Sequence, residues 1–244
     1  EIDGFGLGRA DRIAFHPTDQ NTYYVGSSGG GLWKTTNDGA SWTPLTDFIA
    51  SLGIGGLFVS WANANHIYIL TGDGDSDLQN GLVDQFDYER KAMGVYRSTD
   101  GGTTWTFLSP VDTNFYLSFR LSQCPTDASI MLAATSTGLY RTTNGGFNWT
   151  RELTGQYHDV EWKPGTNRAY AASKTNISYS TDGGATWFLS VLDSAFVSPL
   201  KMELAVTPAA PNNVYLLAGG SDTTVGKFCG FYKSTNSGVT YAQV

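Results

Sequence analysis

Short runs in which apolar and polar residues alternate make up most of this chain. Residues 12–17 and 22–26 are typical, because each run has the two-residue period of a strand with one buried face and is bounded by turn-forming residues. No stretch carries the apolar spacing of an amphipathic helix of useful length. The pattern therefore predicts an all-β protein built from short strands.

An eight-residue motif that occurs five times groups these strands into repeats. It reads hydroxyl residue, any residue, Asp or Asn, any residue, Gly, two of any residue, aromatic residue, and its copies begin at Thr35, Ser98, Thr142, Ser180 and Ser234. The Asp or Asn side chain can accept hydrogen bonds from backbone N–H groups ahead of it, and the Gly supplies a positive φ angle. The aromatic ring then packs back over the turn. Each octet therefore predicts a tight hairpin.

Three residues of each octet build the predicted hairpin: the Asp or Asn, the Gly and the aromatic. They are Asn37, Gly39, Trp42, Asp100, Gly102, Trp105, Asn144, Gly146, Trp149, Asp182, Gly184, Trp187, Asn236, Gly238 and Tyr241. In this interpretation they belong to the scaffold of the protein and not to a ligand site.

Two further strand patterns precede each octet, so every repeat holds four short strands within about 40–60 residues. This is the signature of a β-propeller blade. We predict an all-β β-propeller of four-stranded antiparallel blades, with repeats at about 9–48, 53–110, 117–153, 156–192 and 200–244. We expect residues 1–244 to be a β-propeller domain or part of a larger one, with about five blades in this piece. A five-bladed ring closed on itself is the alternative.

Composition narrows the class of protein. The 244 residues carry a formal net charge of −7, which is a poor match for nucleic acid or an anionic membrane as a partner. No apolar run approaches the length of a membrane span. Charged residues make up only 15% of the chain, as is common in secreted β-proteins. Cys124 and Cys229 have no companion at a metal-binding spacing, and we expect them to be unpaired.

The five octets resemble Asp-box repeats, also called BNR repeats, and the resemblance covers essentially the whole chain. Such repeats occur in sialidases, sortilin-like propellers, xyloglucan-cleaving glycoside hydrolases of family 74 and photosystem assembly propellers. The fuller pattern at 15–19, 24–26, 31–36 and 68–75 is similar to large secreted proteins of Bacteroidota. The resemblance implies an extracellular or cell-surface location, further domains in a longer chain, and a C-terminal sorting domain of the type IX secretion kind.

The same resemblance bears on catalysis. In these families the octets lie away from the face that binds substrate, which implies a structural role for them here. The arginines form no recognisable sialidase triad, so the resemblance does not extend to that activity. Family 74 enzymes carry a catalytic Asp in a Tyr-x-x-x-Asp-x-Gly-Gly stretch, and in the matching stretch from Tyr24 this chain has Ser28. A neutral hydroxyl cannot replace a carboxylate as acid or base at neutral pH, which argues against hydrolysis.

Residues 71–93 form the only long insertion, between the second and third strands of the second repeat. Asp73, Asp75 and Asp77 alternate there, and Asp84 stands at the twelfth position counted from Asp73. Carboxylates at positions 1, 3, 5 and 12 are typical of a calcium loop, although Leu78 stands where that loop needs Gly. The alternatives are a solvated acidic loop and a catalytic carboxylate pair. No cofactor is required, and Ca²⁺ is the one that this pattern predicts.

Aromatic residues beside this loop give a second candidate site. Phe86 and Tyr88, together with Trp61, could form a platform for a sugar or a peptide, whereas propeller aromatics otherwise pack in the blade core. The predicted partner is a glycan or an extracellular protein, without nucleic acid and without membrane insertion.

Three functions stay open at this level. The first is a non-catalytic secreted or cell-surface propeller that binds a glycan or protein partner. The second is a family 74-like glycoside hydrolase that acts on polysaccharide, with Asp73, Asp75 or Asp159 as candidate catalytic carboxyls. The third is a structural subunit of an extracellular surface assembly. The first is our leading hypothesis, so we expect a non-enzymatic protein.

Overall fold

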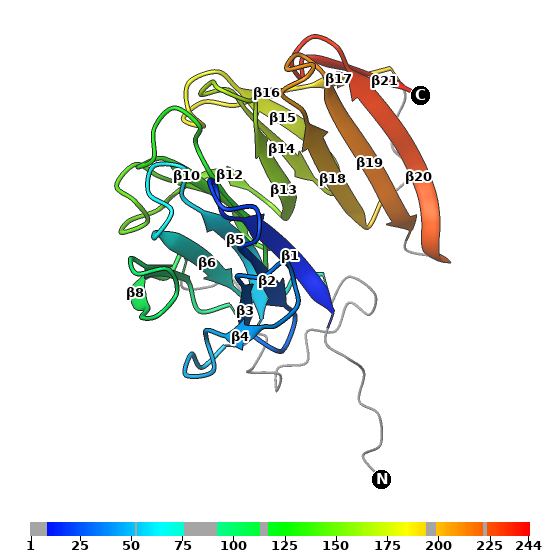
Figure 1. Ribbon diagram of the computed structural model, residues 1–244. Helices are drawn as coiled ribbons and strands as arrows, with labels where there is room; N and C mark the ends of the chain where they lie inside the picture. The colour runs from blue at the N-terminus through cyan, green and yellow to red at the C-terminus, as the bar shows by residue number, and fades with distance from the viewer. Residues whose placement is uncertain (1–8, 52, 76–91, 113–116, 194–198, 222–223) are drawn as a thin grey trace.

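The computed structural model describes residues 9–51, 53–75, 92–112, 117–193, 199–221 and 224–244. Within these ranges the regular structure is all β, and no helix is long and apolar enough to cross a membrane. Five sheets, each with four antiparallel strands and the last with one additional parallel strand, follow one another around an arc (Figure 1). The prediction of an all-β propeller with four-stranded antiparallel blades is confirmed.

Each blade uses four consecutive strands, ordered from the inner strand to the outer strand. Blade 1 contains β1 (Ala10–Phe15), β2 (Tyr23–Ser27), β3 (Leu32–Thr35) and β4 (Thr43–Pro44). Blade 2 contains β5 (Ile54–Val59), β6 (Ile67–Thr71), β7 (Val95–Ser98) and β8 (Thr106–Ser109). Blade 3 contains β9 (Ser118–Gln123), β10 (Met131–Thr135), β11 (Gly138–Thr142) and β12 (Thr150–Thr154).

The last two blades are joined by one additional strand. Blade 4 contains β13 (Tyr157–Trp162), β14 (Ala169–Ser173), β15 (Ile177–Ser180) and β16 (Phe188–Leu189). Blade 5 contains β18 (Lys201–Val206), β19 (Val214–Ser221), β20 (Thr224–Ser234) and β21 (Thr240–Gln243). The segment that leaves blade 4 forms β17 (Val191–Leu192), which pairs in parallel with β21 and makes the fifth sheet five-stranded.

The antiparallel order gives each blade two different ends. The turn between its first two strands and the octet turn between its last two strands lie at one end. The turn between the second and third strands, and the link to the next blade, lie at the opposite end. We call this opposite end the loop face. Residues 28–31, 72–75, 136–137 and 174–176 belong to it.

The octet turns share one hydrogen-bond pattern. In the second octet the Asp100 carboxylate accepts from the backbone N–H of Thr104 at 2.8 Å, and the Ser98 hydroxyl accepts from the backbone N–H of Gly102 at 2.8 Å. Gly102 has a φ of 96°, which a side chain rarely adopts. The corresponding bonds recur in all five octets, with the side-chain acceptors Asn37, Asp100, Asn144, Asp182 and Asn236. The first hydroxyl of the octet is therefore as much a part of the turn as its Asp or Asn.

The octet aromatics are less buried than their size predicts. Tyr241 is fully buried, whereas Trp105, Trp149 and Trp187 are half-buried and Trp42 is exposed. The indole N–H of Trp105 donates to the carbonyl of Gly102 at 3.1 Å, so one edge of the ring is fixed to the turn. Each tryptophan lies at the rim of a blade interface and not at its centre.

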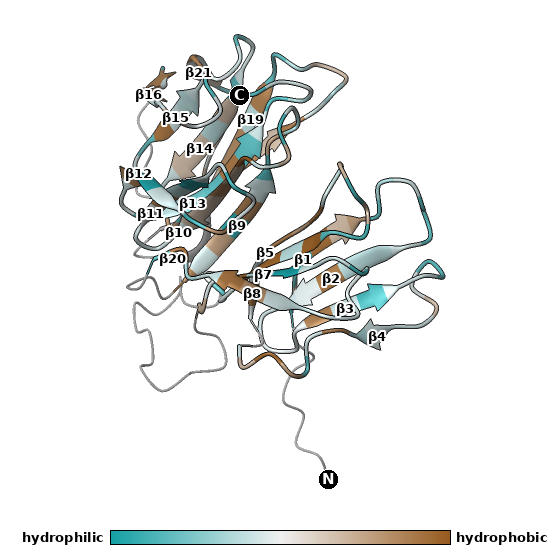
Figure 2. Ribbon diagram, turned by 90° about the vertical axis from the view of Figure 1, so that its left-hand side faces the viewer, coloured by the Kyte–Doolittle hydropathy of each residue, from teal (hydrophilic) through white to brown (hydrophobic). Residues whose placement is uncertain are grey.

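Adjacent blades are held together by apolar clusters, one for each of the four interfaces. Tyr24 and Leu32 of blade 1 pack with Leu57 and Ile67 of blade 2. The next interfaces contain Tyr68, Leu70, Leu121 and Met131, then Phe119, Leu132, Val160 and Trp162, then Tyr170, Ala172, Leu204 and Val214. Figure 2 shows brown, hydrophobic stretches along the strands of neighbouring blades. The core of this protein therefore lies between sheets and is divided into four parts.

We predict that removing one octet hydroxyl destabilises the protein. Ser98→Ala leaves the buried backbone N–H of Gly102 without its acceptor, so the free energy of unfolding should fall by about 1–3 kcal/mol. Thr103→Ala, at an exposed hydroxyl of the same turn, should change it by less than about 0.5 kcal/mol. Denaturant unfolding measures both, and equal effects would contradict this account of the turn.

Candidate functional site

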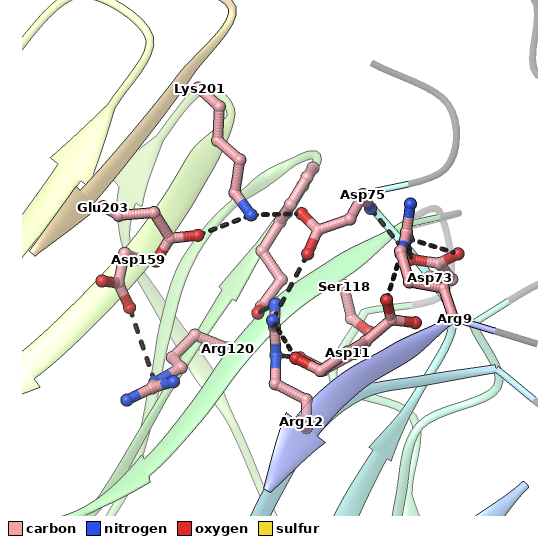
Figure 3. A network of polar contacts seen from close by, with 12 residues as sticks. Arg9, Asp11, Arg12, Asp73, Asp75, Ser118, Arg120, Asp159, Lys201 and Glu203 are labelled. Carbon is pink, nitrogen blue, oxygen red and sulfur yellow. Dashed lines mark hydrogen bonds and ion pairs between the residues drawn. The ribbon is translucent and has the colours of Figure 1, made fainter. Parts of the chain in front are cut away.

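The inner strands carry charged residues at one equivalent position. The strand pairing places Arg12, Gly56, Arg120, Asp159 and Glu203 at the same register position of blades 1 to 5. In blades 2 to 5 the next residue of the strand is apolar and packs toward the preceding blade, so the residue at the equivalent position points toward the following blade. These side chains form an inner-strand network with residues of the loop face. Its described members are Arg9, Asp11, Arg12, Asp73, Asp75, Arg120, Asp159, Glu161, Lys201 and Glu203, most of them drawn in Figure 3.

Arg12 connects three blades. Its Nε donates to the carbonyl of Gly55 at 2.8 Å, and its Nη2 donates to the carbonyl of Phe119 in blade 3. A Cβ atom at Gly55 would lie 2.1 Å from Oγ of Ser118, so only glycine allows β5 to approach β9 this closely. Because blade 2 offers no side chain at this point, the guanidinium of blade 1 reaches across it to blade 3.

Asp73 begins the long insertion and is fixed against blades 1 and 3. Arg9 Nη2 contacts both carboxylate oxygens of Asp73, at 3.1 and 3.2 Å, and Arg9 also contacts Asp11. Ser118 donates to the carbonyls of Thr71 and Gly72, at 2.8 and 3.1 Å. Burial raises the pKa of Asp11, although Arg9 opposes this effect. The first residues of the insertion are therefore part of the ordered scaffold.

Asp75 and Lys201 join blade 5 to the insertion of blade 2. Lys201 Nζ lies 2.7 Å from Asp75 Oδ1 and 2.5 Å from Glu203 Oε1, and Arg12 Nη1 lies 3.3 Å from Asp75 Oδ2. Figure 3 shows Lys201 between the two carboxylates. Burial on its own would raise the pKa of Asp75, but Arg12 and Lys201 outweigh it and hold that pKa below the ordinary value. Asp75 is therefore an anion in the folded protein at neutral pH.

Asp159 and Glu161 share one cation on β13. Arg120 Nε lies 3.5 Å from Asp159 Oδ1, and Arg120 Nη2 contacts Glu161. Asp159 Oδ2 accepts from the backbone N–H of Leu204 at 2.8 Å. Burial raises the pKa of Asp159 to about 8 and also raises that of Glu161, because one guanidinium cannot neutralise both carboxylates. Asp159 is about 1% exposed, so it supports the blade 4–blade 5 contact and does not face a ligand.

The structure describes only part of the predicted calcium loop. Asp77, Asp84, Phe86 and Tyr88 lie outside the described residues, so the calcium site and the aromatic platform stay predictions. The carboxylates of Asp73 and Asp75 contact arginine and lysine cations in this structure. Among the described side chains, no group of three or more Asp, Glu, His or Cys is arranged to hold a metal ion.

Trp61 is the one aromatic of the predicted platform that the structure describes. It lies in the turn between β5 and β6, at the end of the blade opposite the loop face, and its indole N–H donates to the carbonyl of Cys124 at 2.9 Å. The ring is 51% exposed, but it is fixed against blade 3.

Ser28, where the resemblance puts a catalytic carboxylate, lies on the loop face beside the network. Its backbone N–H donates to the carbonyl of Arg9 at 3.3 Å. The same loop runs close to the insertion, because a Cβ atom at Gly53 would lie 3.3 Å from the Ser28 carbonyl and 3.2 Å from the Asp73 backbone N. The carboxylates of this face therefore come from the inner strands and the insertion, not from the loop at 28–31.

Sequence reasoning missed most of the network. Among its members only Asp73, Asp75 and Asp159 were considered, although each inner strand carries a usable signal. A charged residue stands directly before an apolar one in Arg12-Ile13, Arg120-Leu, Asp159-Val and Glu203-Leu. The signal becomes visible only when the strands of different repeats are aligned by register, because the repeats differ in length.

Comparison with known proteins supports this fold. No protein-family model matches the chain. A xyloglucanase from Paenibacillus sp is 27% identical over 121 residues, covering 45% of this chain and 11% of the relative. A xyloglucanase from Hypocrea jecorina is 24% identical over 156 residues, covering 51% of this chain and 18% of the relative. The chain therefore spans less than a fifth of the length of these curated relatives.

The solved structures extend the similarity to the whole chain. The GH74 enzyme of Niastella koreensis matches with a TM-score of 0.75 and 23% identity, over 98% of this chain and 37% of that protein. At this identity the match shows a shared fold. The chain is thus similar to the GH74 β-propellers in the arrangement of its blades, and its relatives in sequence act on xyloglucan.

We predict that Asp75→Asn destabilises the folded protein in a pH-dependent way. The folded state lowers the pKa of Asp75, so its contribution to stability is present above the ordinary carboxyl pKa and is lost as the pH falls through the lowered value. The variant should lose about 2–4 kcal/mol at about pH 7 and almost nothing at about pH 2. Asp47→Asn, at an exposed carboxylate, is the control. A pH-independent loss would show that the ion pairs are not the cause.

Asp159 should have the opposite dependence on pH. The pKa of Asp159 is raised in the folded state. Its contribution to the free energy of unfolding is therefore greatest below the ordinary carboxyl pKa and declines until the pH passes about 8. Asp159→Asn should flatten this decline, which amounts to at most about 1.4 kcal/mol per pH unit. Denaturant unfolding at pH values between about 5 and 9 tests this, and parallel curves for both proteins would contradict it.

Proposed function

We propose that the protein containing this chain is a glycoside hydrolase of the GH74 kind that acts on xyloglucan or a closely related β-glucan. The observation that carries the proposal is the similarity in sequence to xyloglucanases, at 24–27% identity over about half of this chain. The GH74-like arrangement of the blades supports the shared fold. This is the second of the three functions that the sequence left open, and it replaces the non-catalytic binder as the leading one.

Asp75 and Glu203 are the carboxyl pair that we assign to the reaction. Both contact the same nitrogen, at 2.7 and 2.5 Å, so their contacting oxygens lie at most about 5 Å apart. Retaining glycosidases place their two carboxyl groups about 5–5.5 Å apart, and inverting enzymes place them about 6.5–9.5 Å apart. Asp75 is 14% exposed on the loop face, which gives it more access to substrate than Asp159 has. Glu203 is 41% exposed on the face of blade 5 that has no following blade among the described residues.

The environments of the two groups separate their roles. Asp75 is held ionised by Arg12 and Lys201, which suits the carboxylate that attacks the anomeric carbon. Glu203 would then protonate the leaving oxygen as the glycosidic bond breaks, and would later activate water to release the sugar from Asp75.

The residue at position 28 favours a second function, binding of the polysaccharide without cleavage. Ser28 stands where the resemblance places a catalytic carboxylate, and the nearby carboxylates Asp73, Asp75 and Glu203 all contact cations. A propeller that binds the same polysaccharide without cleaving it would have these features. With either function, we propose that the protein acts outside the cell.

An assay of xyloglucan with the full-length protein tests the proposal. We expect new reducing ends to appear, and we expect Glu203→Gln to lower their rate of release by at least about 100-fold because the acid is lost. Glu152→Gln, on the outer strand β12, should leave the rate unchanged.

Two results would contradict the proposal in different ways. Depletion of the protein onto xyloglucan without new reducing ends would establish the binding function. New reducing ends that persist in Glu203→Gln would keep the hydrolase and reject the assigned pair.

A further inference from the structure

Three buried polar atoms without a hydrogen-bond partner gather at the interface between blades 4 and 5. Among the described residues nine buried side-chain nitrogen or oxygen atoms lack such a partner, and three of them are Nη2 of Arg168 and the hydroxyls of Tyr170 and Tyr241. Arg168 directly precedes β14 and Tyr170 lies within it, whereas Tyr241 lies on β21. We call these three residues the donor cluster. Because a buried polar group without a partner is costly, the cluster indicates a partner that the chain itself does not supply.

The three groups of the donor cluster lie close together. A Cβ atom at Gly238 would stand 2.6 Å from the Tyr170 ring and 3.5 Å from the Tyr241 hydroxyl, so both side chains border the same point of the fifth octet. Nε of Arg168 donates to the carbonyl of Ser237, the residue before this glycine, at 2.8 Å. Burial and the neighbouring Tyr170 raise the pKa of Tyr241, and the nearby Arg168 opposes them. The guanidinium is therefore fixed beside the two phenol rings.

The cluster exists because the fifth octet ends in tyrosine, whereas the other four end in tryptophan. In three of those octets the indole N–H donates to the carbonyl of the octet's own glycine, at 2.9–3.1 Å, from Trp105, Trp149 and Trp187. In the fifth octet the carbonyl of Gly238 accepts from the Ser190 hydroxyl at 2.6 Å. The Tyr241 hydroxyl is not bonded to the turn, and it brings a polar group into the interface between two blades.

The additional strand β17 closes the outer side of the cluster. It places Leu192 opposite Tyr241, and the backbone N–H of Val191 donates to the carbonyl of Val239 at 3.0 Å. Tyr241 is only 2% exposed as a result, and Tyr170 is fully buried. Bulk solvent therefore does not reach the two hydroxyls, and their partner has to be enclosed between the blades.

All three groups of the cluster are hydrogen-bond donors. A guanidinium has no acceptor, and each phenol has one proton to donate. Burial raises the pKa of Tyr170 and of Tyr241, so both hydroxyls keep their protons at neutral pH. Arg168 donates to a backbone carbonyl and its Cζ lies 4.7 Å from the centre of the Tyr179 ring, and no described carboxylate forms an ion pair with it. The cluster therefore presents an excess of donors and a positive charge.

We propose that the donor cluster binds one small monovalent anion, chloride, enclosed between blades 4 and 5. A halide ion accepts hydrogen bonds from several directions at once, so it receives the guanidinium N–H and both phenol protons. A single water molecule accepts two hydrogen bonds and leaves one of the three donors without a partner. The ion also neutralises a guanidinium that is partly removed from water.

The ion joins two sheets, because Arg168 and Tyr170 belong to blade 4 and Tyr241 belongs to blade 5. A ligand that binds only the folded protein stabilises it in proportion to the logarithm of its concentration once the site is filled. The stability of this interface should therefore depend on chloride. This inference does not depend on the proposed hydrolase activity.

Bromide in place of chloride tests the proposal directly in crystals of the unmodified full-length protein. We expect crystals grown in sodium bromide to give an anomalous-scattering peak between Nη2 of Arg168 and the hydroxyls of Tyr170 and Tyr241. A water molecule at this place without a bromide peak would overturn the proposal. Direct hydrogen bonds among the three groups, with nothing between them, would overturn it as well.

Thermal unfolding of the full-length protein gives a second measurement in solution. At constant ionic strength, exchanging sodium gluconate for about 0.2 M sodium chloride should raise the melting temperature by roughly 2–4 °C. Tyr241→Phe removes only the hydroxyl and should lose at least about half of this shift. Tyr96→Phe, on β7 of blade 2, is the matched control and should keep the whole shift. Equal chloride dependence in the two variants, or none in the unmodified protein, would contradict the site.

Discussion

Each blade of this protein is a single sheet with two apolar faces, and neither face is buried without a neighbour. The four apolar clusters lie between blades, and each draws its members from the same register positions on two adjacent sheets. Burial of this surface outweighs the entropy cost of ordering short strands, most of which are four to six residues long. One blade on its own therefore has no core, and the stability of every sheet depends on the sheets beside it.

The same packing explains why charge collects on the inner strands. At the inner strand one residue faces the preceding blade and the residue before it faces the following blade, and Arg12, Arg120, Asp159 and Glu203 occupy this second position. Six carboxyl groups face four cations among the described members of this network. The cations lower the pKa of Asp75, whereas burial raises the pKa of Asp159. Neighbouring carboxyl groups therefore differ in how readily they bind a proton.

The octets and the alternating strands made the blades predictable, because both signals are local. The turn needs only the residues from Ser98 to Trp105 or their equivalents. A strand is predicted from the alternation of apolar and polar residues within its own segment. The inner-strand network was not predictable in the same way. Arg12 reaches Phe119 across Gly55, and Lys201 meets Asp75 although many residues separate them, so these contacts exist only once the blades are placed. The exposed ring of Trp42 likewise depends on which blade lies beside it.

The strand β17 gives blade 5 a different edge from the other blades. Asp193 accepts from the backbone N–H of Gln243 at 3.1 Å, and the Asp193 backbone N–H donates to the Tyr241 carbonyl at 3.0 Å. The connection out of blade 4 thereby occupies the outer rim of its successor, and an open row of backbone groups, which invites pairing with foreign strands, is closed along β21. Blade 5 therefore cannot open at its outer edge without breaking the pairing between β21 and β17, the segment that follows blade 4. Blades 4 and 5, which share an apolar interface like the other neighbouring blades, are thus also joined through their backbones.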